Sequence, residues 1–185
     1  PPCLIGMEAC ASAHHWGRWL AGMGIDVRLL PARYVRAYVK RNKTDAADAE
    51  AICEAVTRPS MRFVPIKNAE QQSVLSLHRA RQGFVKARTA QANQIRGLLA
   101  EYGITLPQGI GHVTNRLPGI VEDAQNDLHG VFRELLERLR VHLLERSRRV
   151  KELDGLSDAW HPRREGSQKL AQIPGIGPLT ASALV

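Results

Sequence analysis

The sequence has few aromatic residues, few cysteines and no long apolar run, and each shortage excludes a class of protein. Aromatic residues make up 5% of the 185 residues, which argues against a surface that stacks successive nucleotide bases. The three cysteines form no C-x-x-C pair, so we expect neither a disulfide framework nor a zinc ribbon, and a reducing cytoplasm suits them. No apolar stretch approaches the roughly 20 residues that span a bilayer, and no signal peptide is visible, so no membrane partner is expected.

Positive charge is what the sequence has in excess. The net charge is +8 and the pI is about 9.9, although the 44% of hydrophobic and 24% of charged residues are ordinary for a globular protein. Such an excess favours a polyanionic partner, and nucleic acid is the first candidate. A basic protein without any such partner remains an open alternative, because net charge alone does not distinguish the two.

The two ends of the chain are unusual. It opens with "PPCLIGMEA", which has no initiator Met, and closes with "GPLTASALV", which stops inside a helix-like pattern. Both ends are expected to be cut from a longer chain.

The first part of the chain predicts a small α/β domain at residues 1–57. Residues 3–9 and 25–31 are short apolar runs typical of buried strands, and residues 11–24 between them have apolar side chains at helical spacing, with Gly22 and Gly24 as a stop. Strand, helix and strand at this spacing predict a βαβ unit with parallel strands. Residues 32–57 are helical by composition.

The rest of the chain predicts helices. Residues 69–102 and 122–154 carry apolar side chains three or four residues apart, with a turn-rich break at 103–119. We expect a long antiparallel helical hairpin or coiled coil within residues 58–160, whose remaining apolar faces favour a homo-oligomer. Residues 157–168 read as a polar linker, and residues 161–185 as the start of a further helical domain.

Three carboxylates are candidates for a metal site. Asp45 and Asp48 in "NKTDAADAEAICEA" are three residues apart, so on a helix both lie on one face. The simpler alternative is that Asp45 caps the helix and Asp48 lies in its first turn, where the helix dipole favours negative charge. Glu8, however, ends the first strand, where sites of α/β domains form. Mg²⁺ prefers a few carboxylates and keeps its other positions for water and phosphate.

These residues occur in a stretch that resembles a known family. Residues 6–52, with Glu8–Ala9, Gly24 and Val27, Pro31, and "KTDAADA" at 43–49, are similar to the N-terminal domain of the DEDD-type insertion-sequence transposases. This family is related to the pilin-gene invertases and includes bridge-RNA-guided recombinases. More loosely, the resemblance extends through the long helices to the end of the chain.

The resemblance implies a fold and an activity. It implies that residues 1–57 are part of a RuvC-like domain with an RNase H-type fold, whose four acidic residues bind Mg²⁺; Glu8, Asp45 and Asp48 match the second, third and fourth. The first Asp of the family lies on an earlier strand that this chain lacks, and the nucleophilic serine lies further downstream than Ser182. It implies an enzyme that cuts and rejoins DNA, in some members with a guide RNA, in the bacterial or archaeal cytoplasm at the nucleoid. The chain alone is expected to show little or no recombination.

Two basic segments and one glycine turn are candidate nucleic-acid contacts. Residues 27–44 and 71–100 contain no acid, whereas residues 133–152 mix Arg with Glu and predict an ion-paired helix surface. "IPGIGPLTA" at 173–181 resembles the start of the family's C-terminal domain and also a helix-hairpin-helix, whose glycines let a phosphate approach the backbone. Solvated helix faces and a plain Pro-Gly turn are the alternatives. The candidates are Arg36, Lys40, Arg41, Lys43, Arg79, Arg81, Lys86, Arg88, Arg96, Gly175 and Gly177.

A different class of function also fits the sequence. A non-catalytic nucleic-acid-binding or dimerisation module would use only the basic helices, with carboxylates that merely cap a helix. His14 and His15 are adjacent, so they diverge on a helix and are expected at its surface rather than on one metal.

Overall fold

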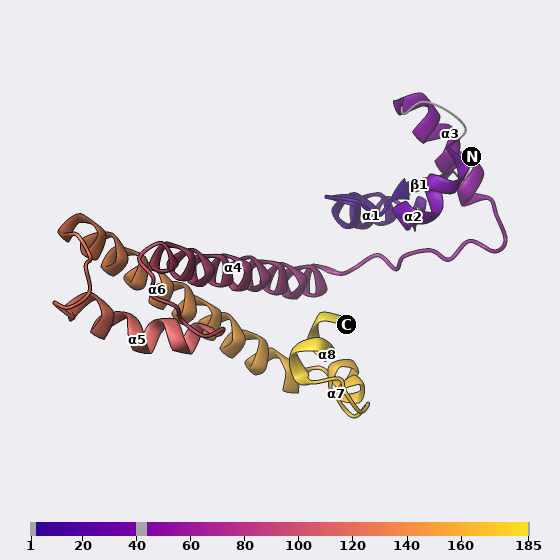
Figure 1. Ribbon diagram of the computed structural model, residues 1–185. Helices are drawn as coiled ribbons and strands as arrows, with labels where there is room; N and C mark the ends of the chain where they lie inside the picture. Colours follow the sequence, from indigo (N-terminus) through magenta and orange to yellow (C-terminus); the bar gives the residue numbers. More distant parts are fainter. Residues whose placement is uncertain (1–2, 40–43, 185) are drawn as a thin grey trace. The chain divides into compact units, whose positions relative to one another are not determined.

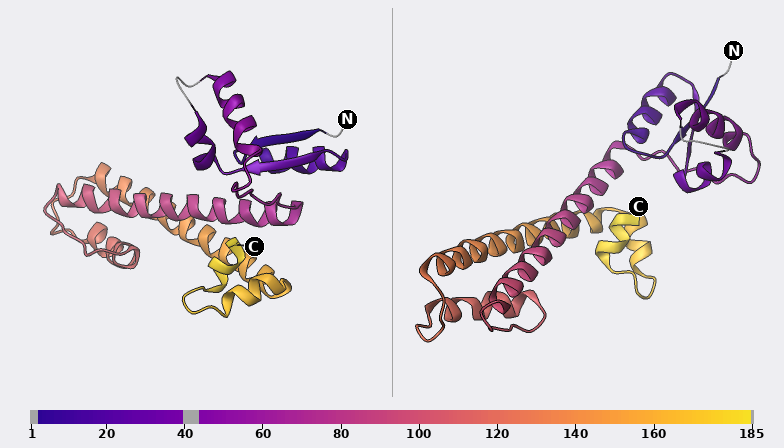
Figure 2. Two further views of the ribbon diagram at one scale, coloured as in Figure 1. Left: turned by 90° about the vertical axis from the view of Figure 1, so that its right-hand side faces the viewer. Right: turned by 45° about the horizontal axis from the view of Figure 1, so that its top comes forward.

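The computed structural model describes residues 3–39 and 44–184. The chain forms two compact units, Pro1–Ser73 and Val74–Val185 (Figure 1). The first unit holds the strands, and the second is built from helices (Figure 2). This is the expected combination of a small α/β part and an all-α part.

The first unit is built on a two-stranded parallel sheet. Strands β1 (Leu4–Glu8) and β2 (Asp26–Leu30) are joined by helix α1 (Ala13–Gly22), as expected for a βαβ unit. Leu4 is paired with Asp26, and Glu8 with Leu30. Val64 extends this edge, since it forms an antiparallel bridge with Leu29 and donates its backbone N–H to the Leu29 carbonyl over 2.8 Å.

Helix α1 buries its small residues and exposes its large ones. Ala13 and Gly17 are buried, and a methyl group added at Gly17 would lie only 3.1 Å from the Ile66 Cδ1 atom. Trp16 and Trp19 are 47% and 50% exposed. His14, expected at the surface, is partly buried, and its Nδ1 accepts the backbone N–H of Lys67 over 3.1 Å. The close approach of residues 66–67 therefore decides which face of α1 is inside.

The helical segment expected at 32–57 is interrupted. It consists of α2 (Ala32–Val35), the short 3₁₀ helix η1 (Arg36–Tyr38) and α3 (Asp45–Val56). The core of this region contains Leu30, Val35, Ala51, Ala55 and Val56. Helix α3 therefore packs through its C-terminal two turns and leaves its first turn near solvent.

The second unit is dominated by two long helices, α4 (Ala69–Ala100) and α6 (Gly130–Trp160). They run antiparallel: Arg81 pairs with Asp154, Gln91 bonds Arg146, and the ring of Tyr102 stacks on Phe132. Their shared core of buried side chains includes Ile95, Leu99, Leu136 and Leu143.

The segment expected as a turn-rich break contains a helix. Helix α5 (Ile110–Glu122) carries Pro118 in its interior and buries Val113 and Leu117 against the same core. The second long helix consequently begins at Gly130 rather than at 122, after a turn in which Asp123 accepts the backbone N–H of Gln125 over 2.9 Å.

The C-terminal residues are helical as well. The 3₁₀ turn η2 (His161–Arg163), helix α7 (Glu165–Ala171) and helix α8 (Pro178–Leu184) follow α6 closely, so the linker expected at 157–168 is largely helical. Within the described ranges, none of the helices combines the length and hydropathy that crossing a bilayer requires.

Candidate functional site

Glu8 lies where the sequence predicted it, at the carboxyl end of β1. Its register partner is Leu30, the last residue of β2, and the next residue, Ala9, donates its backbone N–H to the Leu30 carbonyl over 2.8 Å. Because the strands are parallel, their carboxyl ends share one edge of the sheet. The Glu8 side chain is partly exposed at this edge.

Asp45 and Asp48 lie in the first turn of α3, but neither caps it. Thr44 is the N-cap residue, and its hydroxyl accepts the backbone N–H of Ala47 over 3.2 Å. Asp45 is the first helical residue and exposed, whereas Asp48 is partly buried. The alternative in which Asp45 is the cap is therefore wrong. Both carboxylates still face the positive end of the helix dipole.

The contact between α3 and β1 orients these residues. Gly6 lies directly under α3: a methyl group added there would lie 3.0 Å from Ile52 Cγ2 and 3.1 Å from Val56 Cβ. Glu8 is two residues beyond Gly6, on the same face of the strand. Asp45 and Asp48 precede Ile52 by seven and four residues, on the same face of the helix. Glu8 therefore lies on the strand face that α3 packs against, and Asp45 and Asp48 lie on the helix face that contains Ile52.

The oxygen donors of Glu8, Asp45 and Asp48 suit a hard cation. Carboxylate oxygens are the ligands that Mg²⁺ prefers. Over residues 3–39 and 44–184, however, no three His, Cys, Asp or Glu side chains come together in a group that could hold a metal ion.

The basic segment before α3 is only partly described. Lys40, Arg41 and Lys43 lie outside the described residues. Arg36, on η1, is exposed. Within the described ranges, the structure shows no ion pair for it.

The basic residues of α4 divide into two groups. Arg81 forms an ion pair with Asp154, and Arg96 donates to the Leu106 carbonyl over 3.3 Å, so both hold the second unit together. Arg79 and Lys86 are exposed. Arg88 is partly buried, and its Nε has no hydrogen-bond partner in the part of the chain that the structure describes.

The arginines of α6 behave as the sequence predicts. Arg138 pairs with Glu134, Arg140 with Glu137, and Arg148 and Arg149 with Glu145 and Glu152. The pairing with Arg140 lowers the pKa of Glu137, mainly through their hydrogen bond. This surface is an internally paired one.

Gly175 and Gly177 lie in the turn between α7 and α8. Gly175 has a φ of 88°, a conformation that favours glycine, and the Ile176 N–H donates to the Ile173 carbonyl over 3.0 Å. Helices α7 and α8 pack against each other, so this segment is a short helical hairpin.

Ser182 is part of a buried network rather than an exposed group. Its hydroxyl lies 3.1 Å from Ser157 Oγ and 3.1 Å from His78 Nε2, which joins α8, α6 and α4. Burial lowers the pKa of His78, and the charge of Arg81 lowers it further. Sequence patterns gave no sign of this network, because its members are 25 and 104 residues apart.

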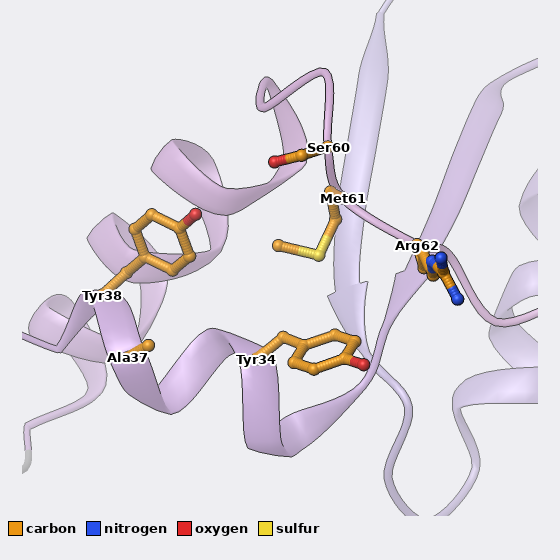
Figure 3. Close-up of a pocket in the computed structure, with 6 residues that line it drawn as sticks. All are labelled: Tyr34, Ala37, Tyr38, Ser60, Met61 and Arg62. Carbon is orange, nitrogen blue, oxygen red and sulfur yellow. The ribbon is translucent and has the colours of Figure 1, made fainter.

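A cavity in the first unit was also missed. It has a volume of about 260 Å³ and is lined by Tyr34, Ala37, Tyr38, Ser60, Met61 and Arg62 (Figure 3). The only sequence signal for this cavity was the spacing of Tyr34 and Tyr38, which are four residues apart. No local pattern indicated that residues 60–62 lie beside them.

Comparisons with known proteins place the chain in one family. A family model of the DEDD transposases of the IS110 type, described as a transposase, matches residues 1–104. Over its full length the chain is 46% identical to a probable family 20 transposase of Pseudomonas aeruginosa, of which it covers 55%.

It is also similar to two further curated proteins. It is 41% identical to a putative transposase of Sinorhizobium fredii, of which it covers 47%. It is 40% identical to the transposase for insertion sequence element IS1328 of Yersinia enterocolitica, of which it covers 54%. The chain thus spans about half the length of the curated relatives it matches.

Proposed function

Because the chain belongs to the DEDD transposase family of the IS110 type, we propose that it takes part in cutting and rejoining DNA strands at the ends of an insertion sequence. The observation that supports this proposal is the packing of α3 on β1 at Gly6, on the strand face that carries Glu8 and on the helix face that carries Asp45 and Asp48. These three carboxylates belong to the part of the chain that the family model matches.

Glu8, Asp45 and Asp48 are the proposed ligands of a divalent cation, Mg²⁺ in the first instance. Three oxygen donors of this kind suit an ion that keeps other positions for water and phosphate. None of the three takes part in an ion pair with another described residue, and the cap of α3 is supplied by Thr44. We propose only which residues bind the cation, and no coordination geometry, because no three such side chains come together among the described residues.

DNA is the proposed partner, bound through the basic candidates. Arg36, Arg79 and Lys86 are exposed and suited to phosphate contact, with Arg88, Lys40, Arg41, Lys43 and the glycine turn at 175–177 as further contacts. Arg81 and Arg96 are proposed only in a supporting role, since each already bonds within the second unit. A guide RNA would use the same phosphate contacts.

A homo-oligomer through the long helices is also proposed. Helix α6 exposes apolar side chains that the shared core leaves uncovered; they are Val131, Leu135, Val141, Leu144 and Leu156. Light scattering during size-exclusion chromatography tests this, with a single-chain mass as the contradicting result.

The metal proposal is tested by thermal unfolding with and without Mg²⁺. We expect Mg²⁺ to raise the unfolding temperature of the wild-type chain, because a ligand that binds only the folded state stabilises it. A chain carrying both Asp45→Asn and Asp48→Asn is expected to fold normally and to lose this increase.

The matched control is Glu50→Gln, which removes one charge from the opposite face of α3. It is expected to keep the response to Mg²⁺. An equal response in wild type and in the double variant would refute the assignment of Asp45 and Asp48.

One observation favours a second function. The exposed basic residues Arg36, Arg79 and Lys86 would equally serve a non-catalytic nucleic-acid-binding module. Such a module predicts salt-sensitive DNA affinity, no response to Mg²⁺, and a lower unfolding temperature for the double variant without metal.

A further inference from the structure

The cavity of the first unit is formed by two segments that are distant in sequence. Tyr34 comes from α2, Ala37 and Tyr38 from η1, and Ser60, Met61 and Arg62 from the chain after α3. Figure 3 shows the two tyrosine side chains on the same side of α2 and η1, with the Met61 side chain between them and Ser60 above. Tyr38 and Met61 pack against the core of this unit, so that side of the cavity is fixed.

Aromatic rings and guanidinium groups are combined around this cavity. Arg33 lies over the Tyr34 ring at 4.7 Å and donates to its hydroxyl over 3.0 Å, and Arg58 lies over the Tyr38 ring at 5.8 Å. Tyr34 remains 36% exposed. Arg62 lines the cavity, and within residues 3–39 and 44–184 it forms no ion pair. The six lining residues include no carboxylate.

Size and chemistry restrict what the cavity can hold. Its volume of about 260 Å³ is below the roughly 300–1,000 Å³ of sites for drug-sized ligands. A single planar ring system fits this size better than a whole dinucleotide. Aromatic faces stack on any base, the hydroxyls of Ser60 and Tyr38 can bond its edge, and arginine attracts the adjoining phosphate.

We propose that this cavity binds one unpaired base of a single DNA strand, with Tyr34 as its stacking face and Arg62 at the adjoining phosphate. This inference rests on the proposed function, because the ligand is the same DNA. One base of that DNA would turn out of the base stack and enter the cavity. Its location supports it: α2 and η1 pack against α3, whose first turn carries Asp45 and Asp48. The cavity therefore adjoins the helix that bears two of the three carboxylates.

The test measures binding of a labelled thymidine oligonucleotide, a DNA duplex of the same length and a uridine oligonucleotide. Tyr34→Leu is expected to weaken single-stranded DNA binding by roughly 5- to 140-fold, the range for loss of one base–aromatic stack. Tyr34→Phe is expected to retain wild-type binding, and duplex binding is expected to be unchanged in both variants.

The matched control is Trp19→Leu, which removes an exposed aromatic ring from the same unit outside the cavity. It is expected to leave all three affinities unchanged. Arg62→Gln is a second test variant in case Tyr34→Leu does not fold. Arg62 is exposed and is not part of the core, so this substitution is not expected to affect folding. It is expected to weaken single-stranded DNA binding more than duplex binding.

The contradicting results are distinct. If single-stranded DNA binds equally to wild type, Tyr34→Leu and Arg62→Gln, the cavity proposal is wrong while the proposed function stands. If the substitutions affect only the uridine oligonucleotide, the cavity serves RNA and the proposal is likewise overturned. If the wild-type chain binds neither form of DNA, both proposals fail.

Discussion

The arginines of the two units are used differently. In the second unit, those on the exposed surface of α6 are paired with glutamates of the same helix; they are Arg138, Arg140, Arg148 and Arg149. In the first unit, Arg28 and Arg58 also have carboxylate partners, but each lies over an aromatic ring as well. Arg33, Arg36 and Arg62 form no ion pair within the ranges that the structure describes.

This difference shows why net charge did not locate a binding surface. In an ion pair on an exposed helix, the glutamate neutralises the arginine, so the pair attracts a phosphate only weakly. A guanidinium without a carboxylate partner keeps its full positive charge and attracts a phosphate more strongly. The candidates for nucleic-acid contact are therefore Arg36 and Arg62 of the first unit together with Arg79 and Lys86 of α4, rather than the paired arginines of α6.

The largest effect is expected in the scaffold of the second unit. Leu136 is fully buried between α4, α5 and α6, so Leu136→Ala is expected to lower the free energy of unfolding by about 2–5 kcal/mol, through reduced burial and a cavity. Leu184→Ala, at a position 60% exposed in α8, is expected to change it by less than about 1 kcal/mol. Denaturant titration measures both. Equal losses would contradict the assignment of the core.

In the first unit, a smaller loss is expected where α3 meets β1. Gly6→Val adds a side chain against Ile52 and Val56, and overpacking of this kind costs about 1–3 kcal/mol. Gly22→Ala adds a methyl group where nothing lies within 4 Å and is expected to be neutral or slightly stabilising. Thermal unfolding measures the pair. An unchanged unfolding temperature for Gly6→Val would mean that α3 does not pack closely on β1 at this residue.

A third comparison uses the salt dependence of DNA binding. The double variant Arg36→Ala and Arg62→Ala is expected to reduce the slope of log affinity against log salt by about 0.9 for each phosphate that the protein no longer neutralises. The double variant Arg138→Ala and Arg148→Ala, which removes two glutamate-paired arginines, is expected to leave the slope unchanged. The reverse result would place the DNA-binding surface on α6.

The smallest effect is expected from His78. Burial and the charge of Arg81 lower its pKa below the ordinary value of 6.5, so below that pH the unfolded chain binds more protons than the folded one. Stability from this group is complete above about pH 6.5 and is lost as the pH falls through the lowered pKa. His78→Gln should flatten this part of the pH profile of the unfolding temperature. An unchanged slope would exclude His78 as its source.

Part of this structure was predictable from sequence and part was not. The βαβ unit and the two long helices follow from apolar spacing, which burial imposes directly. Helix α5 was missed although Ile110, Val113, Leu117 and Val121 have helical spacing, because Pro118 and nearby glycines are typical of turns. In this case the burial of Val113 and Leu117 outweighs the cost of a proline in the helix.

The candidate site shows the same limit. The spacing of Asp45 and Asp48 predicts that they share a helix face, but only the structure shows that α3 packs on β1 at Gly6, through Ile52 and Val56. The cap at Thr44 was not expected, although threonine is a common N-cap residue. Contacts between distant segments, such as Tyr34 with residues 60–62, leave no local pattern to detect.

The most direct test of the central claim locates a bound cation by nuclear magnetic resonance. Mn²⁺, which shares the oxygen preference of Mg²⁺, broadens the signals of nearby backbone amides. The expected result is that the amides of Glu8, Ala9 and residues 45–48 broaden first, and that excess Mg²⁺ restores them. Broadening confined to residues 74–185, or broadening at residues 45–48 that Mg²⁺ does not reverse, would contradict a site formed by Glu8, Asp45 and Asp48.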